Sequence, residues 1–206
     1  MQPKRVTLAP TALDRNGIAQ AQTTAGADLT LNGALSGTMD VPRHVSVYCA
    51  ADMSGVVFTV TGTDRYGTII TEAITGPNAT TVNGTKNFKT VTRVAVDGAV
   101  GTNCEVGSAD EMETEWIPLD YIYPVGTIQV ELSTSASITY AWQTTADDVQ
   151  AAGFQESDAA VTVDTGVTAE TTSQRGSDTG YATASRLAVT SYASGSLVAT
   201  FMQGSR

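Results

Sequence analysis

Short runs of alternating apolar and polar residues recur along this chain, and no long segment has the 3.6-residue period of a helix. Thr and Val dominate these runs, and Gly, Asn, Asp and Pro lie between them. A period of two places alternate side chains on one face of a strand, and Thr and Val suit such half-buried surfaces. The sequence therefore predicts an all-β protein of two β-sandwich or barrel-like units, with short hairpins and extended arms.

Three hairpins are predicted from pairs of such runs. The runs 58–63 and 68–74 flank Asp64-Arg65-Tyr66-Gly67, in which Gly67 is free to take a positive φ. GTIQVELST and ASITYAWQTTADD form a second pair around residues 133–135, and SRLAVTSYASGSLVATF forms a third around 193–195. Single strands are also expected in HVSVYCA, where the period of two places Val45, Val47 and Cys49 on one face, and in KTVTRVAVDG and NCEVG.

The composition of the chain changes along its length and predicts four segments. Residues 1–40 are rich in small and polar residues and predict an N-terminal extended arm. Residues 41–107 form a first β unit, residues 108–116 an acidic linker, and residues 117–206 a second β unit. Within the second unit, residues 147–180 are expected to form a long loop with room for a strand at 160–163. Like the arm, this loop is expected to reach onto neighbouring subunits.

The motifs of enzymes, metal sites and cofactor sites are missing from the sequence. His44 is the only histidine, which removes most general-base and triad arrangements. The acidic linker lacks the glycine and the ligand spacing of a calcium loop, and no zinc or phosphate-binding motif occurs. We therefore expect no catalytic residues, no metal ligands and no cofactor.

Charge and hydropathy exclude two classes of partner. The formal net charge is −10, and the 11 Lys and Arg residues form no cluster that could displace counterions from nucleic acid. No run approaches the roughly 20 apolar residues of a membrane span, and the first residues lack the apolar core of a signal peptide. We expect use without secretion, and for such a protein two free, buried thiols at Cys49 and Cys104 are favoured over a disulfide.

Several stretches of the chain resemble the small structural proteins of tailed bacteriophages. In the first half these are DRNGIAQAQTTAGADLTLNGALSG, SGVVFTVTGTDRYGTIITEAITGPNATTV and TKNFKTVTRVAVDGA. In the second half ITYAWQTTADDVQ and ASRLAVTSYASGSLVATFMQGSR are similar to the same kind of protein. The resemblance implies a virion component, assembled in the host cytoplasm, and carries no catalytic motif.

The expected function is that of a capsid decoration (cement) protein, which bridges major capsid protein subunits and stabilises the head. The alternatives are a neck or tail adaptor or fibre-attachment component, and a carbohydrate-binding module that uses aromatic residues around Trp116 and Trp142. Besides the major capsid protein or neck and tail proteins, further copies of the chain itself are expected partners, as a homo-oligomer. The residues predicted to contact a partner are the basic pair Lys4 and Arg5 and the aromatic residues Trp116, Tyr121 and Tyr123.

Overall fold

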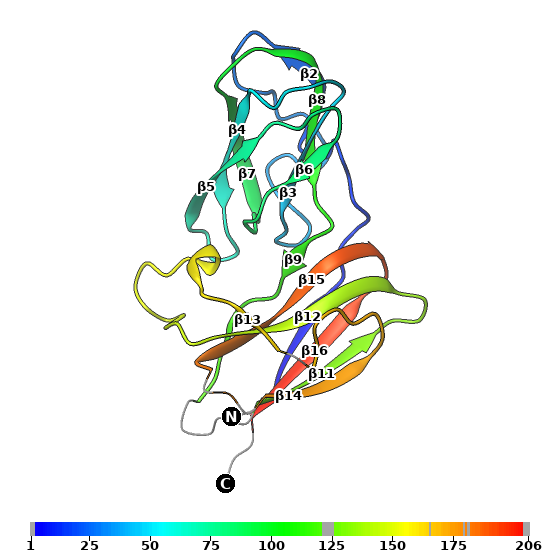
Figure 1. Cartoon of the computed structure of the whole chain (residues 1–206), viewed down its shortest axis with the longest axis vertical. Helices are drawn as coiled ribbons and strands as arrows, with labels where there is room; N and C mark the ends of the chain where they lie inside the picture. Colours follow the sequence, from blue (N-terminus) through cyan, green and yellow to red (C-terminus); the bar gives the residue numbers. More distant parts are fainter. Residues whose placement is uncertain (1–2, 121–125, 165, 179, 181, 204–206) are drawn as a thin grey trace. The chain divides into compact units, whose positions relative to one another are not determined.

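The computed structural model describes residues 3–120, 126–164, 166–178, 180 and 182–203. As the alternation of apolar and polar residues predicted, the fold is all-β, with antiparallel sheets and one short 3-10 helix, η1 (Glu156–Asp158), in the described ranges (Figure 1). No helix among these residues is long and apolar enough to cross a membrane. The chain divides into two compact units.

Unit 2 comprises Leu13–Asp110 and contains two sheets. The first has the order β2-β8-β3-β6 and the second the order β5-β4-β7. The strands are β2 (Ala19–Thr24), β3 (Val45–Cys49), β4 (Val57–Thr63), β5 (Ile69–Thr75), β6 (Thr81–Asn83), β7 (Thr90–Val96) and β8 (Val100–Ser108). Apolar side chains of both sheets, such as Val47 and Val106 from one and Phe58 and Val94 from the other, belong to one buried cluster. This unit is therefore a sandwich with a single core.

Unit 1 is discontinuous in sequence, because it comprises Met1–Ala12 and Glu111–Arg206. Its two sheets have the orders β1-β16-β11-β14 and β10-β15-β12-β13, and β9 also pairs with β15. The strands are β1 (Lys4–Leu8), β9 (Met112–Glu113), β10 (Ile117–Pro118), β11 (Gly126–Leu132), β12 (Ser137–Thr145), β13 (Thr162–Val163), β14 (Gln174–Asp178), β15 (Ala184–Ser194) and β16 (Leu197–Gln203).

The core of unit 1 contains the inward side chains of both its sheets. Ile128 and Phe201 come from the first sheet, and Trp142 and Leu187 come from the second; all four are buried. Gly176 on β14 lies against this core, because a Cβ atom there would lie 3.1 Å from the Trp142 ring and 3.3 Å from Ile128. Trp142 thus packs between the two sheets of the unit.

The predicted arm over residues 1–40 is wrong in the structure. Strand β1 pairs antiparallel with β16, and β2 pairs with β8. Ile18, Leu29 and Met39 are buried in the core of unit 2. Composition misled here because the segment contains few large apolar residues, yet Ile18, Leu29 and Met39 are buried, although Leu13 is 47% exposed.

Two of the three predicted hairpins are also wrong. β4 and β5 do form the expected hairpin, with Gly67 at a φ of 84°. However, β11 and β12 lie in different sheets, and so do β15 and β16. Each of these two short connections carries the chain from one sheet of the sandwich to the other. Alternation predicts which side chains face the core. Two connected strands direct their apolar side chains into the same core whether they pair in one sheet or lie in opposite sheets, and so alternation does not predict their pairing.

Two further predictions need correction. The segment 147–180, predicted as a long loop with room for a strand at 160–163, contains β13 at that place. It also contains η1 and the five-residue strand β14, whose polar sequence gave no apolar signal. Cys49 and Cys104 form a disulfide bond, where free thiols were predicted. The prediction used the cellular compartment and the number of cysteines, whereas the antiparallel pairing of β3 with β8 brings the two residues face to face.

Candidate partner-binding face

The outer face of the sheet β1-β16-β11-β14 in unit 1 carries a row of polar and cationic side chains. Register pairs Arg5 with Thr200, Thr200 with Gln129, and Gln129 with Arg175. All four side chains point away from the core, because their neighbours along each strand are the ones that alternate inward. With a spacing of about 4.8 Å between strands, the row extends roughly 14 Å across the sheet. We call these four residues the arginine row.

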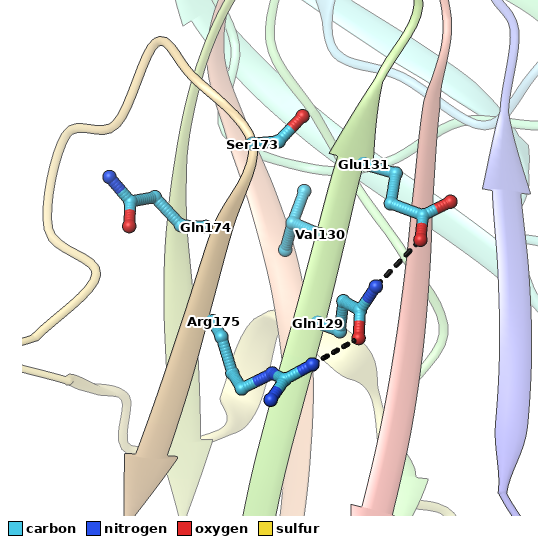
Figure 2. Close-up of a pocket in the computed structure, with 6 residues that line it drawn as sticks. All are labelled: Gln129, Val130, Glu131, Ser173, Gln174 and Arg175. Carbon is cyan, nitrogen blue, oxygen red and sulfur yellow. Dashed lines mark hydrogen bonds between the residues drawn. The ribbon is translucent and has the colours of Figure 1, made fainter.

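Hydrogen bonds hold one half of the arginine row in place (Figure 2). The Arg175 guanidinium donates from Nη2 to Oε1 of Gln129 at 3.0 Å. Gln129 in turn donates from Nε2 to a carboxylate oxygen of Glu131 at 2.6 Å. Because each side chain is tied to the next, the guanidinium plane of Arg175 is held in place before any partner binds.

The other end of the row is open. Arg5 is exposed on β1, which is an edge strand of its sheet. Its guanidinium has no hydrogen bond or ion pair with a residue in the described ranges. Within these ranges the five N–H donors of Arg5 have no partner, and a guanidinium pairs well with carboxylates in bidentate geometry.

The arginine row gives this face a charge opposite to that of the whole chain. Among the described side chains of this sheet, the outward charged ones are Arg5, Arg175 and Glu131, and these two cations and one anion sum to a net charge of +1. The formal charge of the whole chain is −10. A positively charged face on an otherwise acidic protein attracts an acidic partner surface, while the rest of the protein repels that partner.

A shallow hollow of about 380 Å³ lies between β11 and the segment that ends in β14. It is lined by Gln129, Val130, Glu131, Ser173, Gln174 and Arg175. Figure 2 shows these side chains spread along two neighbouring strands and not converging on one point. Pockets for small molecules enclose most of the ligand and are largely apolar. The open, polar geometry here fits the rim of a protein contact better than a small-molecule site.

The structure places the predicted contact residues in different surroundings. Arg5 is part of the arginine row. Lys4 lies on the other side of β1, where its ammonium group is 3.1 Å from a Glu115 carboxylate oxygen. Trp116 is buried, and the Arg186 guanidinium lies 4.5 Å from the centroid of its ring. Tyr121 and Tyr123 lie outside the described residues.

Gln129 and Arg175 were missed at the level of sequence. Gln129 stands at an outward position of an alternating run, which could have marked it as surface. Arg175 lies in QRGSD, which has no apolar alternation, and so no sequence pattern placed it on a strand. Only the pairing of β11 with β14 brings these two residues side by side.

Three of the aromatic residues that could have formed a platform for sugars are buried. Trp116, Tyr140 and Trp142 are all at most 5% exposed. A carbohydrate-binding surface needs ring faces open to solvent, and these rings are packed in the core instead. These three described rings therefore give no support to the carbohydrate-binding alternative, whereas Tyr121 and Tyr123 lie outside the described residues.

No cluster of metal-ligating side chains is found in the described part of the chain. No three His, Cys, Asp or Glu side chains in these ranges gather closely enough to hold a metal ion.

Desolvation by burial, helped by the negative charge of Glu170, raises the pKa of Tyr140 to about 12. The Tyr140 hydroxyl donates to the Thr172 backbone carbonyl at 2.6 Å, and so this shift accompanies a structural hydrogen bond.

Comparison with known proteins provides no further constraint: no protein-family model, no curated protein and no solved structure matches this chain.

Proposed function

We propose that this protein is a non-enzymatic structural component of a bacteriophage particle, a decoration protein that binds the major capsid protein through the arginine row of unit 1. The main support for the proposal is the arginine row on the outer face of the sheet. Two guanidinium groups stand on a rigid sheet face, one pre-positioned by Gln129 and one open to solvent. Arginine is enriched in protein interfaces because its planar fork binds carboxylates and carbonyl oxygens in fixed geometry.

The shape of the face supports a macromolecular partner. The outward side chains of β16 and β11 next to the row are Val198, Met202 and Thr127, which are half-buried and short or flexible. A flat surface with a few apolar contacts and cations at its edges matches the core and rim of a protein interface. The resemblance of the chain to phage structural proteins supplies the kind of partner.

Binding to particles that lack the native protein tests the proposal. The variant with Arg5→Ala and Arg175→Ala should occupy such particles at least about tenfold more weakly, because each lost charged contact costs more than about 1 kcal/mol. Occupancy is measured by co-sedimentation of purified protein with the particles.

The control is a variant with Gln20→Glu and Thr23→Glu, which changes the net charge by the same two units on exposed positions of β2 in unit 2. Wild-type occupancy by the arginine variant would contradict the proposed face. Counting copies distinguishes the head from the neck or tail: a decoration protein scales with the major capsid protein, and an adaptor does not.

A further inference from the structure

The outer face of the sheet β5-β4-β7 in unit 2 has an unusual composition for an acidic protein. Its outward positions carry mainly Thr and Ala. They are Val57, Thr59, Thr61 and Thr63 on β4; Ile69, Thr71, Ala73 and Thr75 on β5; and Thr92, Arg93 and Ala95 on β7. We call this surface the threonine face. These strands lie together in unit 2 in Figure 1.

Charge is nearly absent from the threonine face. Arg93 is the only outward charged residue of the three strands, and Asp28 neutralises it through hydrogen bonds of 2.6 and 3.0 Å. The carboxylate of Glu72 lies on the opposite side of β5, where it accepts hydrogen bonds from Thr85 and Lys86. The face is therefore neutral, although the chain carries a formal charge of −10.

The face also presents apolar surface at one end. Ile69 is 72% exposed, and Tyr66 in the adjoining turn is 61% exposed. The turn is held by Asp64, which is buried and whose carboxylate accepts from the backbone N–H groups of Tyr66 and Thr68 at 2.8 and 2.9 Å. Tyr66 is thus displayed on a fixed turn, and Ile69 stands at the first position of β5.

Side-chain size permits a close approach at the centre of the face. Thr59 on the central strand pairs with Ala73 on one side and with Ala95 on the other. The row Ala73-Thr59-Ala95 therefore leaves a low strip across the sheet. Sheets pack face to face at about 10 Å when their facing side chains interdigitate. Such a strip can receive the side chains of a second sheet.

We propose that the threonine face is a contact between two copies of this chain. Three kinds of partner can be compared by charge. A basic partner is attracted to surfaces rich in carboxylates, and an acidic partner is attracted to the arginine row, but the threonine face favours neither. A second copy is repelled by most of the surface, because both molecules are strongly acidic, and this neutral face is where the two can meet at the lowest electrostatic cost.

Symmetry and size define the contact further. Most contacts between identical chains are twofold, so that each face meets the same face of its partner. Strands of seven residues in a three-stranded sheet cover roughly 20 by 14 Å. Two such faces cover roughly 560 Å² in total, well below the roughly 1,200 Å² of a stable protein interface, and so the contact is weak and reversible.

Charge substitution at Thr59 tests the inference on purified protein in solution, without any particle, and so its outcome is independent of the function proposed above. Sedimentation equilibrium over a concentration series should show wild-type monomers and dimers. Thr59→Glu and Thr59→Lys should each weaken dimerisation by at least about tenfold, because like charges then face each other across the twofold axis. A mixture of the two variants should regain dimerisation as a mixed dimer.

The matched controls are Thr23→Glu and Thr23→Lys, which make the same changes at an exposed position on β2, in the other sheet of the unit. They should dimerise as the wild type does. If a Thr59 variant fails to fold, Ala73→Glu and Ala73→Lys, on the exposed side of β5, provide the same test. A wild type that stays monomeric up to about 1 mM would overturn the inference, and so would unchanged dimerisation in the charged variants.

Discussion

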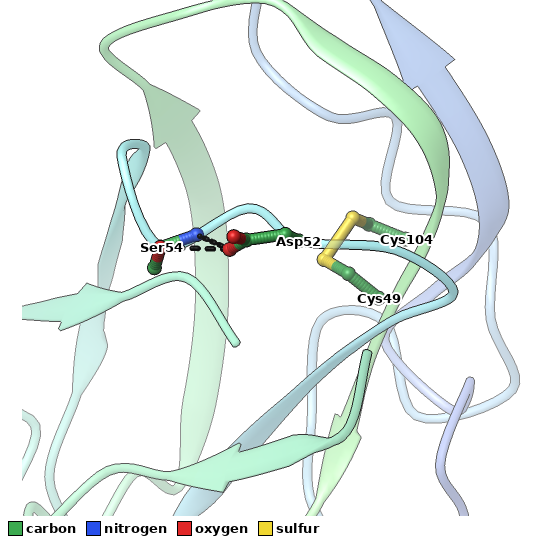
Figure 3. The surroundings of a disulfide bond; sticks show 4 residues. All are labelled: Cys49, Asp52, Ser54 and Cys104. Atoms are coloured by element: carbon green, nitrogen blue, oxygen red, sulfur yellow. Dashed lines mark hydrogen bonds between the residues drawn. A yellow bond between two sulfur atoms is a disulfide. The ribbon is translucent and has the colours of Figure 1, made fainter. Parts of the chain in front are cut away.

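Cys49 and Cys104 lie directly opposite each other on β3 and β8, and their sulfur atoms form a disulfide inside unit 2 (Figure 3). Both residues are completely buried, and they are 55 positions apart in sequence. The bond joins β3 to β8, which is the last strand of unit 2, and the strands β4 to β7 lie between them in sequence. It therefore restrains most of the chain between them in the unfolded state.

The disulfide should stabilise unit 2 substantially. Closing a loop of this length is worth about 4 kcal/mol in the chain-entropy model. We expect Cys49→Ala with Cys104→Ala, or reduction of the wild type, to lower the midpoint of unfolding of unit 2 in guanidinium. The described part of unit 1 contains no cysteine, so the transition of that unit is the internal control. Identical unfolding curves with and without reductant would contradict this expectation.

Gly62 should tolerate no side chain. It lies on β4 at the irregularity where the pairing with β7 shifts, and a Cβ atom there would collide with the backbone carbonyl of Thr90. Gly62→Ala should therefore reduce the free energy of unfolding by about 1–3 kcal/mol. Gly101→Ala is the matched control, because Gly101 lies on β8 with open space around its Cβ position. Equal stability of the two variants in denaturant titrations would show that the backbone of β7 can move aside.

Tyr140 should make the stability of unit 1 fall at alkaline pH. The ordinary pKa of tyrosine is 10.0, and burial raises the pKa of Tyr140 to about 12 in the folded chain. Between these values the unfolded chain loses the phenol proton and the folded chain keeps it, and so the free energy of unfolding falls as the pH rises from 10 to 12. Below pH 10 this group contributes no pH dependence.

The comparison that isolates this effect is Tyr140→Phe. Denaturant unfolding of both proteins from about pH 8 to pH 12 should show a steeper loss for the wild type above pH 10. The variant loses the hydrogen bond to Thr172, and so it should be less stable at neutral pH while its curve is flatter at high pH. Parallel curves would mean that Tyr140 titrates normally.

Removal of residues 1–12 should destabilise unit 1. Strand β1 covers one edge of β16, Leu8 is buried, and the Tyr192 hydroxyl donates to the Pro10 carbonyl at 2.6 Å. Loss of the Leu8 burial alone costs about 2–3 kcal/mol. Thermal unfolding and limited proteolysis should show an earlier transition and faster cleavage of unit 1, whereas removal of residues 1–3, which precede β1, should have little effect. An unchanged transition after the longer deletion would restore the arm interpretation.

Alternation within single strands was enough to predict the fold class and many of the inward side chains. Val45, Val47 and Cys49 face the core as the period of two predicted, and the β4–β5 hairpin forms around its Asp64–Gly67 turn. These features are local, because side-chain direction along a strand and the backbone needs of a tight turn depend on neighbouring residues alone.

The arrangement of strands was decided by the tertiary structure. Nothing local distinguishes a turn that pairs two strands from one that crosses to the opposite sheet, and so β11 with β12 and β15 with β16 were mistaken for hairpins. The same holds for contacts between distant segments: the disulfide, the pairing of β1 with β16, and the arginine row each join residues far apart in sequence. The sequence by itself determined the strands and their core-facing sides, and only the packing of two sheets around each core decided which strands became neighbours.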